Sequence, residues 1–415
     1  MQHVVFAMPF RFATSERFLA QMVDLPGVRV GLLSGQPLEQ LPPSLRAGLS
    51  GHWRIEDPFD PRQIVAGCRG LAKQLGGLDG LHGVLEQLQV PLAEAREALG
   101  LPGLSVDSAR GFRDKALMKE RLRAAGLPCA AHCLAESADE ARVFFSQLPG
   151  PCVLKPPAGA GAKDTFRVDD GEQLEQALRA FPPSRRRPLL LEEFVQGHEH
   201  SFDAACRDGE LLWHSVSRYL PSPLTVLEND WIQWCVLLPR EIDGPELDDI
   251  RAAAAKALQV LGMDTGLAHM EWFRREDGSL AISEVGARPP GAQFTSLMSW
   301  AHDHDMYRAW SRLVALNEFD PPERRHAVGA AYLRAQGRGR VTNVRGLSRI
   351  QAELGDLIVE AKLPSRGQAP SSSYEGDGHV VLRHHDTETL EKALLRVVQL
   401  VRVELSPAAD SSAQG

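Results

Sequence analysis

The chain has 415 residues, of which 43% are hydrophobic and 24% are charged, and its formal net charge at pH 7 is −8. This length predicts several domains, and the composition is typical of a globular protein. The negative charge argues against a surface that coats nucleic acid, and no apolar run approaches the roughly 20 residues that span a bilayer. The N-terminus lacks the pattern of a secretory signal, so we expect a cytoplasmic protein.

Residues 1–106 alternate between strand and helix patterns. Short strands are expected at 4–8, 28–33 and 81–85, and helices at 15–23, 63–75 and 92–99. This alternation predicts a small α/β layer built on a parallel sheet. The first strand is not followed by G-x-G-x-x-G, so the dinucleotide-binding fingerprint is absent.

Residues 107–187 place one lysine at a predicted helix start and another at a predicted strand end, and the Asp114-Lys115 pair taken alone is more typical of a surface than of a site. A helix begins at Asp114-Lys115 and ends near Gly126, with Pro128 following. A strand at 152–155 then brings Lys155 to a loop of small residues, 158–163, whose backbone N–H groups could cradle phosphate oxygens. The loop lacks the G-x-x-x-x-G-K-[ST] order, and an ordinary surface loop is an equally good interpretation of it in isolation.

Residues 188–320 are dominated by strands. A buried strand at 189–195 ends in Glu192-Glu193, and Asp208-Gly209 lies between two further strand patterns. Residues 245–261 form the main helical pattern of this part. The combination predicts an antiparallel sheet with a helix packed on one face, an α+β unit.

The stretch 266–291 is the most informative. Asp277-Gly278 between two apolar runs predicts a two-residue hairpin turn, in which Glu276 faces Ser279 and Glu271 lies opposite Glu284. The two carboxylates would then have Cβ atoms roughly 5 Å apart and would repel each other unless they share a proton or a cation. With Arg288 close behind, the set suits Mg²⁺ and a phosphate. The alternative is a pair of solvated glutamates on an exposed hairpin.

The last part, 321–405, begins at Pro321-Pro322. We expect short strands between 327 and 382, a Ser- and Gly-rich loop at 364–378 and a final helix from 387. Residues 406–415 are expected to form a disordered tail. The six cysteines form no C-x-x-C pair, and Cys129 and Cys133, which flank His132, are interpreted as free thiols because no second pair has matching spacing.

Taken in chain order, these motifs resemble the ATP-grasp family. They are Asp-Lys at a helix start, Val-Leu-Lys-Pro before a Gly/Ala loop, Glu-Glu-Phe-Val, Gly-x-Glu, and two glutamates on a hairpin followed by Arg. The region 328–403 is similar to the C-terminal part of bacterial L-amino acid ligases. The resemblance implies an N-terminal parallel α/β layer, a central lid subdomain, an antiparallel ATP-binding sheet and a small C-terminal subdomain.

The resemblance also implies ligands for ATP, which would lie between two α+β halves. The phosphates would be held by Lys115 and Lys155 and covered by a lid loop containing Gly159, Gly161 and Lys163. The adenine edge would be held by Glu192 and Glu193 with the backbone of Phe194 and Val195, and the ribose by Glu199.

For the metal and the chemistry, the resemblance implies that Glu271 and Glu284 bind Mg²⁺, with Mn²⁺ as the alternative metal. Arg288 would face the transferring group, and Lys155 would share in catalysis. Many family members carry Asn two residues after the second Glu as a metal ligand, whereas this chain has Gly286.

The implied activity is that of an ATP-dependent carboxylate–amine ligase, which forms an amide or peptide bond through an acyl phosphate and releases ADP and phosphate. Its substrates would be a small carboxylate and an amine, both of them amino acids, with no nucleic-acid or membrane partner. A homodimer through the N-terminal layer is compatible with the sequence. Two alternatives remain open: another ATP-grasp ligase of the purine-pathway or carboxylase-like kind, and a non-catalytic ATP-binding regulatory module.

Overall fold

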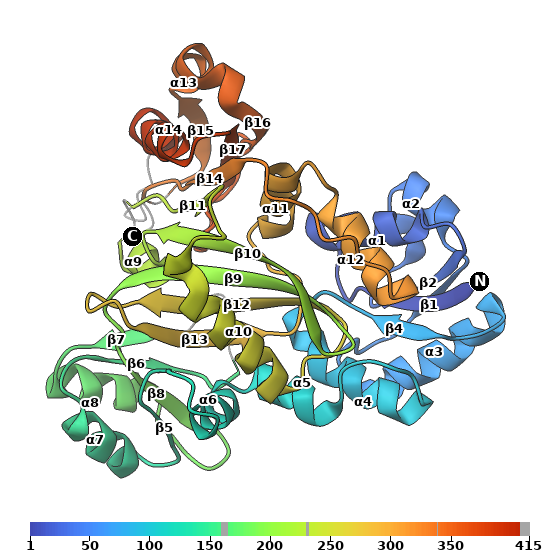
Figure 1. Ribbon diagram of the computed structural model, residues 1–415, viewed down its shortest axis with the longest axis horizontal. Helices are drawn as coiled ribbons and strands as arrows, with labels where there is room; N and C mark the ends of the chain where they lie inside the picture. The colour runs from blue at the N-terminus through green and yellow to red at the C-terminus, as the bar shows by residue number, and fades with distance from the viewer. Residues whose placement is uncertain (159–164, 230–231, 338, 407–415) are drawn as a thin grey trace, which may run out of the picture.

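The computed structural model describes residues 1–158, 165–229, 232–337 and 339–406. The predicted lid residues Gly159, Gly161 and Lys163, and the tail from residue 407 onward, therefore lie outside the described residues. Figure 1 shows the N-terminal layer on the right, a lid at the lower left, a large sheet across the centre and the C-terminal part above it. Within the described residues, no helix has both the length and the apolar character needed to cross a membrane.

The N-terminal layer is a parallel sheet, as predicted. Its strand order is β3-β2-β1-β4. The strands are β1 (Gln2–Ala7), β2 (Val28–Ser34), β3 (Gly51–Arg54) and β4 (Gly80–His82), and the helices are α1 (Ala13–Val23), α2 (Pro43–Gly48), α3 (Pro61–Leu75) and α4 (Gln89–Leu99). Alternate β1 residues enter two cores, since Phe6 packs with α1 residues and Val5 with α3 and α4 residues. Strand β3 was not predicted.

The lid is a four-stranded antiparallel sheet in the order β5-β8-β6-β7. Its strands are β5 (His132–Ala135), β6 (Cys152–Lys155), β7 (Phe166–Val168) and β8 (Leu189–Glu193), and its helices are α7 (Ala138–Gln147) and α8 (Gly171–Ala180). Two helices, α5 (Val106–Arg113) and α6 (Lys115–Ala124), join it to the N-terminal layer. Strand β8 lies beyond the expected boundary at residue 187, yet it pairs with β5 and β6 of the lid.

The large sheet has the order β13-β12-β9-β10-β11-β14-β17-β16, and all of its pairs are antiparallel. Its strands are β9 (His198–Arg207), β10 (Glu210–Leu220), β11 (Cys235–Leu238), β12 (Gly266–Arg274), β13 (Leu280–Gly286), β14 (Ala327–Leu333), β16 (Ile358–Lys362) and β17 (Gly378–His384). The expected boundary near residue 321 thus falls inside one continuous sheet.

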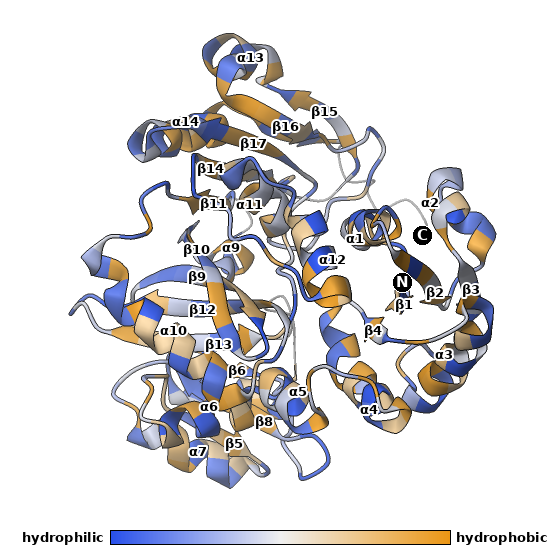
Figure 2. Ribbon diagram, turned by 45° about the vertical axis from the view of Figure 1, so that its right-hand side comes forward, coloured by the Kyte–Doolittle hydropathy of each residue, from blue (hydrophilic) through white to orange (hydrophobic). Residues whose placement is uncertain are grey.

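Helices cover both faces of the large sheet. Helix α10 (Asp248–Leu261) packs with α6 against residues of β9 and β12, as expected for an α+β unit. Helices α11 (Phe294–His302) and α12 (Met306–Leu316) pack on the other face and also contact the N-terminal layer. The helices are amphipathic, and α3 and α4 show hydrophobic and hydrophilic residues on different sides in Figure 2.

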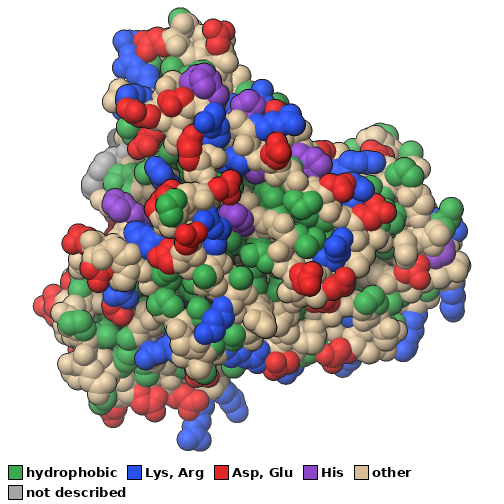
Figure 3. Space-filling view, in the orientation of Figure 1, with side chains coloured by type: hydrophobic (Ala, Val, Ile, Leu, Met, Phe, Trp, Pro, Cys, Tyr) green, Lys and Arg blue, Asp and Glu red, His purple; other side chains and the backbone are tan. Residues whose placement is uncertain are grey.

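The remaining elements complete the C-terminal part and the short turns. They are β15 (Val341–Arg345), α13 (Leu347–Leu354), α14 (Thr387–Leu400), β18 (Arg402–Leu405), α9 (Pro223–Glu228), and the 3₁₀ turns η1 (Leu38–Gln40), η2 (Glu86–Leu88), η3 (Pro245–Leu247) and η4 (Gly355–Leu357). On the face drawn in Figure 3, acidic and basic side chains are interspersed. That face therefore lacks the extended basic surface expected of a nucleic-acid-binding protein.

The two Asp-Gly hairpins differ. In β9–β10, Arg207 pairs with Glu210, so Asp208-Gly209 is a two-residue turn, and both residues have positive φ as a type I′ turn requires. In β12–β13 the predicted two-residue turn is wrong. Arg275 N–H donates to Ser279 O at 2.8 Å, which makes a three-residue loop of 276–278.

A β-bulge then shifts the β12–β13 register by one residue. Beyond the loop, Trp272 pairs with Ile282 but Glu271 pairs with Glu284, so Ser283 is the extra residue of the bulge. The predicted pairing of Glu271 with Glu284 is confirmed, although the predicted facing of Glu276 and Ser279 is not.

Candidate active site

A cavity of about 400 Å³ is lined by residues of both the lid and the large sheet. All of the predicted site residues that the structure describes line it: Lys115, Lys155, Glu192, Glu193, Phe194, Val195, Glu199, Glu271, Glu284 and Arg288. The fold thus brings together side chains that the sequence spreads over more than 170 residues, from the start of α6 to the loop after β13.

Lys115 occupies the first turn of α6, and its side chain is 5% exposed. Asp114 caps the helix by accepting bonds from Ala116 N–H and Leu117 N–H, which fixes the direction in which Lys115 leaves the helix. Lys115 Nζ lies 2.8 Å from Glu284 Oε1. Lys115 N–H also donates to Pro157 O at 3.0 Å, so the helix start is tied to the segment that follows Lys155.

Glu192 and Glu193, predicted to hold an adenine edge together, have different partners in the structure. They are neighbours on β8, and successive side chains of a strand point to opposite faces. Glu192 Oε2 lies 2.8 Å from Lys155 Nζ, which places this buried carboxylate among the lysines. Glu193 points the other way, pairing with Arg275 Nη1 at 3.0 Å and accepting from Ala131 N–H at 3.2 Å.

Phe194 and Val195 follow β8 along the cavity wall. Phe194 N–H already donates to Pro151 O at 3.0 Å, so the backbone donor predicted for the adenine is engaged in this structure. The Phe194 ring lies under the guanidinium of Arg167, 4.3 Å from its centroid, a cation–π contact that holds β7 against the wall.

Three carboxylates gather at the opposite wall. Glu271 and Glu284 come from the β12–β13 pair, and Glu199 comes from the neighbouring strand β9. Burial, together with the nearby Glu271 carboxylate, raises the pKa of Glu199 well above its ordinary value. Burial would also raise the pKa of Glu284, but the nearby cations Lys115, Lys155 and Arg288 together outweigh it and lower that pKa to about 2.

His269, two residues before Glu271 on the same face of β12, was not predicted as a site residue. Its Nδ1 lies 2.7 Å from Asp203 Oδ1, and its Nε2 lies 3.7 Å from Glu271 Oε1. Burial would lower the pKa of His269, but Asp203 and Glu271 together outweigh it and raise the pKa to about 10, so the ring is a cation. Tyr219 O–H donates to Glu271 Oε1 at 3.2 Å. The sequence does hold a signal for His269: in A-H-M-E it lies two residues before Glu271, and strand residues two apart share a face.

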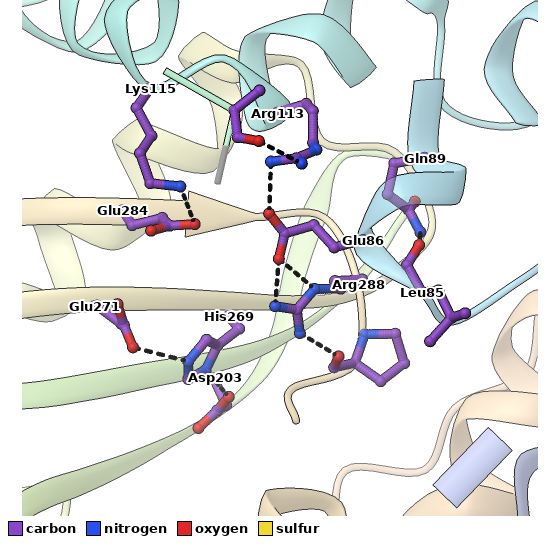
Figure 4. Close-up of polar contacts among 12 residues, drawn as sticks. Leu85, Glu86, Gln89, Arg113, Lys115, Asp203, His269, Glu271, Glu284 and Arg288 are labelled. Carbon is purple, nitrogen blue, oxygen red and sulfur yellow. Dashed lines mark hydrogen bonds and ion pairs between the residues drawn. The ribbon is translucent and has the colours of Figure 1, made fainter. Parts of the chain in front are cut away.

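Glu86 in η2 is a second residue that sequence reasoning missed. As Figure 4 shows, its carboxylate lies between two arginines. Oε2 accepts from Arg288 Nη2 at 2.6 Å and Nε at 3.1 Å, and Oε1 pairs with Arg113 Nη1 at 3.0 Å. Arg288 Nη1 also donates to Pro289 O at 2.9 Å. Of the five N–H bonds of Arg288, the hydrogen bonds to described residues use three and leave two.

The two hairpin glutamates fit a magnesium ion bound together with phosphate oxygens. Among the described residues no group of three or more His, Cys, Asp or Glu side chains could hold a metal ion by itself. Mg²⁺ is commonly held by one or two carboxylates plus substrate phosphates, which is the donor set that Glu271 and Glu284 offer. At Gly286 an added Cβ would meet its nearest atoms only at 3.9 Å, which is ordinary van der Waals contact.

Comparison with known proteins gives a consistent picture. Residues 120–297 match the ATP-grasp domain. The chain is 23% identical over 264 residues to the L-arginine-specific L-amino acid ligase of Bacillus subtilis, covering 61% of this chain and 63% of that protein. It is 26% identical over 231 residues to the D-alanine–D-alanine ligase of Oceanobacillus iheyensis, covering 51% of this chain and 57% of that protein. The matched regions thus span less than two thirds of these two relatives.

Among solved structures, the L-amino acid ligase from Bacillus licheniformis superposes with a TM-score of 0.79 at 18% identity, covering 98% of this chain and 99% of that one. The N5-carboxyaminoimidazole ribonucleotide synthetase from Thermotoga maritima gives a TM-score of 0.69 at 17% identity, covering 98% and 100%. At these identities the likeness is one of fold.

Proposed function

The chain contains an ATP-grasp domain and has the fold of that family, and from this premise we propose that it is an ATP-dependent carboxylate–amine ligase. The observation that carries the proposal is the convergence of Lys115, Lys155, Glu271, Glu284 and Arg288 on one cavity. Cations suited to a polyphosphate and carboxylates suited to its metal ion meet there beside a guanidinium with two N–H bonds to spare.

The proposed reaction has two steps. A substrate carboxylate oxygen attacks the γ-phosphorus of ATP, so that an acyl phosphate forms and the bond to ADP breaks. The lone pair of an amine then attacks the acyl carbon, phosphate leaves, and the nitrogen loses a proton to solvent. Catalysis of this kind depends mainly on positioning and charge neutralisation.

Each described residue has a part in the proposal. Lys115 and Lys155 neutralise phosphate oxygens as mobile point charges. Arg288, held by Glu86, presents its remaining N–H bonds to the transferring phosphate and to the oxyanion of the amine-addition step. Glu199 accepts hydrogen bonds from the hydroxyl groups of the ribose. Magnesium held by Glu271 and Glu284 would supply Lewis-acid stabilisation of the phosphate charge.

The substrates of the relatives suggest amino acids as the first candidates. An L-amino acid ligase and a D-alanine–D-alanine ligase are among the proteins that this chain resembles. We propose a small carboxylate and an amine, at least one of them an amino acid, in a cytoplasmic enzyme that uses ATP and Mg²⁺ or Mn²⁺.

A panel of amino-acid pairs with ATP and Mg²⁺ tests the proposal, read by phosphate release and product mass. The expected result is stoichiometric ADP, phosphate and an amide for at least one pair, lost in Arg288→Met and retained in the surface control Arg312→Met. Phosphate release with bicarbonate in place of the amino acid would instead indicate a carboxylase-like ligase. ATP binding without turnover across both panels would overturn the ligase proposal in favour of a regulatory module.

A further inference from the structure

Lys119, one helical turn after Lys115, has no part in the proposed ligase reaction. Residues four apart share a helix face, so both lysines of α6 point towards the same wall. The side chain of Lys119 is 0% exposed. Its Nζ donates to Ser283 O at 2.8 Å and lies 3.4 Å from Glu192 Oε1. We propose that Lys119 is a positioning residue, the standing partner of Glu192 that lets Lys155 move to the phosphates, and that it also holds the bulge carrying Glu284.

The first step of the argument is the sharing of one carboxylate by two lysines. Glu192 Oε2 is bound by Lys155 and Oε1 faces Lys119. The Lys119 contact is an ion pair without hydrogen-bond geometry, because Oε1 is a buried atom with no hydrogen-bond partner among the described residues. Glu192 can therefore tighten its contact with Lys119 when its other partner leaves.

The second step is the cost of leaving Glu192 alone. A buried carboxylate that loses its only cation is strongly destabilised. If Lys155 were the sole partner of Glu192, its transfer to a phosphate would leave such a carboxylate behind and would oppose ATP binding. With Lys119 in place, Glu192 keeps a cationic partner while Lys155 moves to the phosphates. The two lysines carry two positive charges against the one negative charge of Glu192, so one positive charge is available to the nucleotide.

The third step concerns the other contact of Lys119. Ser283 is the extra residue of the β-bulge, and its carbonyl is the group that the bulge removes from the regular ladder. Lys119 satisfies this carbonyl from a position 164 residues away in the sequence. The next residue is Glu284, so the same ammonium group fixes the backbone from which the proposed metal ligand extends.

This inference rests on the proposed ligase function, and the experiment separates the two. Wild type is assayed first with the amino-acid panel, because an inactive wild type would count against the ligase function itself. Lys119→Met, which keeps an unbranched side chain of similar length, is then compared with wild type for KM of ATP, kcat and the Mg²⁺ concentration for half activity. The exposed Lys256→Met is the matched control and should behave as wild type.

In Lys119→Met we expect KM for ATP to rise about 10- to 100-fold, the range for one hydrogen bond to a charged group, because Lys155 stays bound to Glu192. The Mg²⁺ requirement should rise as well. The double variant Lys119→Met/Glu192→Gln should recover most of the ATP affinity, because the anion that retains Lys155 is gone. A purely structural lysine would lower the melting temperature with KM unchanged, and the double variant would be no better than the single one. Either result in an active protein would overturn the inference.

If Lys119→Met does not fold, Glu192→Gln alone decides, since it leaves Lys119 bound to Ser283 O. If Lys155 moves from Glu192 to ATP as proposed, KM for ATP should be lower in this variant, because Lys155 no longer has to break an ion pair with Glu192. A rise in KM would mean that Glu192 holds Lys155 in its working position, and the exchange would be wrong.

Discussion

Glu271 and Glu284 face each other across the β12–β13 pair, yet each carboxylate has its own cation within the protein. Lys115 of α6 lies 2.8 Å from Glu284, and the imidazolium of His269 lies 3.7 Å from Glu271. The repulsion expected from two opposed carboxylates is therefore offset in the nucleotide-free protein without a shared proton. A metal–nucleotide ligand would compete with these internal partners.

The first prediction concerns Glu284→Gln. Removing Glu284 leaves Lys115, whose side chain is 5% exposed, without its carboxylate, so the nucleotide-free protein should lose stability. We expect a loss towards the lower end of the ~3–5 kcal/mol seen when one partner of a buried pair is removed. The pKa of Glu284 is lowered to about 2, so its contribution is present above the pKa of an unfolded glutamate and disappears as the pH falls towards 2.

Thermal melts with and without ATP and Mg²⁺ measure both effects of this change. Wild type should gain stability from the ligands by mass action, and Glu284→Gln should gain much less. Glu276→Gln in the exposed loop of the same hairpin is the control. Equal ligand-induced shifts in wild type and Glu284→Gln would exclude Glu284 from the metal site.

A second prediction uses Glu199, whose pKa is raised by burial and by Glu271. A carboxyl with a raised pKa costs folding free energy above the pKa of the unfolded group, ordinarily 4.5, and costs nothing well below it. Glu199→Gln should therefore stabilise the nucleotide-free protein at neutral pH, with a gain that vanishes as the pH falls below 4.5. Urea unfolding at several pH values tests this, and a gain that does not depend on pH would contradict it.

Lys155→Ala should weaken ATP binding with little loss of fold. Glu192 keeps Lys119 as a partner in this variant, so no buried carboxylate is left alone. The expected loss of affinity is about 10- to 100-fold, as for one hydrogen bond between charged groups. Calorimetry with ATP and Mg²⁺ measures it, with the exposed Lys256→Ala as control. An unchanged dissociation constant would remove Lys155 from the nucleotide site.

Gly286→Asn should lower the Mg²⁺ concentration needed for half activity. An added Cβ meets its nearest atoms only at 3.9 Å, and an Asn amide oxygen would add a hard ligand beside Glu284. Gly286→Ala fills the same space without a ligand and is the matched control. If the Asn and Ala variants share one Mg²⁺ dependence, the amide does not reach the metal.

The hairpin shows what the sequence could and could not supply. Asp208-Gly209 and Asp277-Gly278 have the same local turn signal, but Asp277 Oδ1 accepts bonds from both the N–H and the O–H of Ser279, which stabilises a longer loop. The predicted Glu271–Glu284 pairing is confirmed only because the bulge at Ser283 cancels this difference. That bulge is bound by Lys119, a contact that no local pattern encodes.

The site shows the same division between local and distant information. Lys115 and Lys155 were expected at the cavity from the family resemblance, and the structure places them there, at a helix start and a strand end. Glu86 could not be predicted, since it meets Arg288 across 202 residues and lies in a short turn with no motif. The pairing of Glu192 with lysines was not predicted, although adjacent glutamates of one strand point to opposite faces and only one of them can face the lysines.

The continuity of the large sheet restricts how this protein can exchange parts with its relatives. Strand β14 pairs with β11 over Cys235–Leu238. A chimaera joined at Pro321-Pro322 would therefore pair β11 of one protein with β14 of another, and their side chains would not be matched to each other. The loop 363–377 between β16 and β17 is a simpler unit to transplant, since its replacement leaves every strand of the sheet in place. Because that loop delivers Tyr374 to the cavity wall, such a transplant would alter the wall while preserving the framework beneath it.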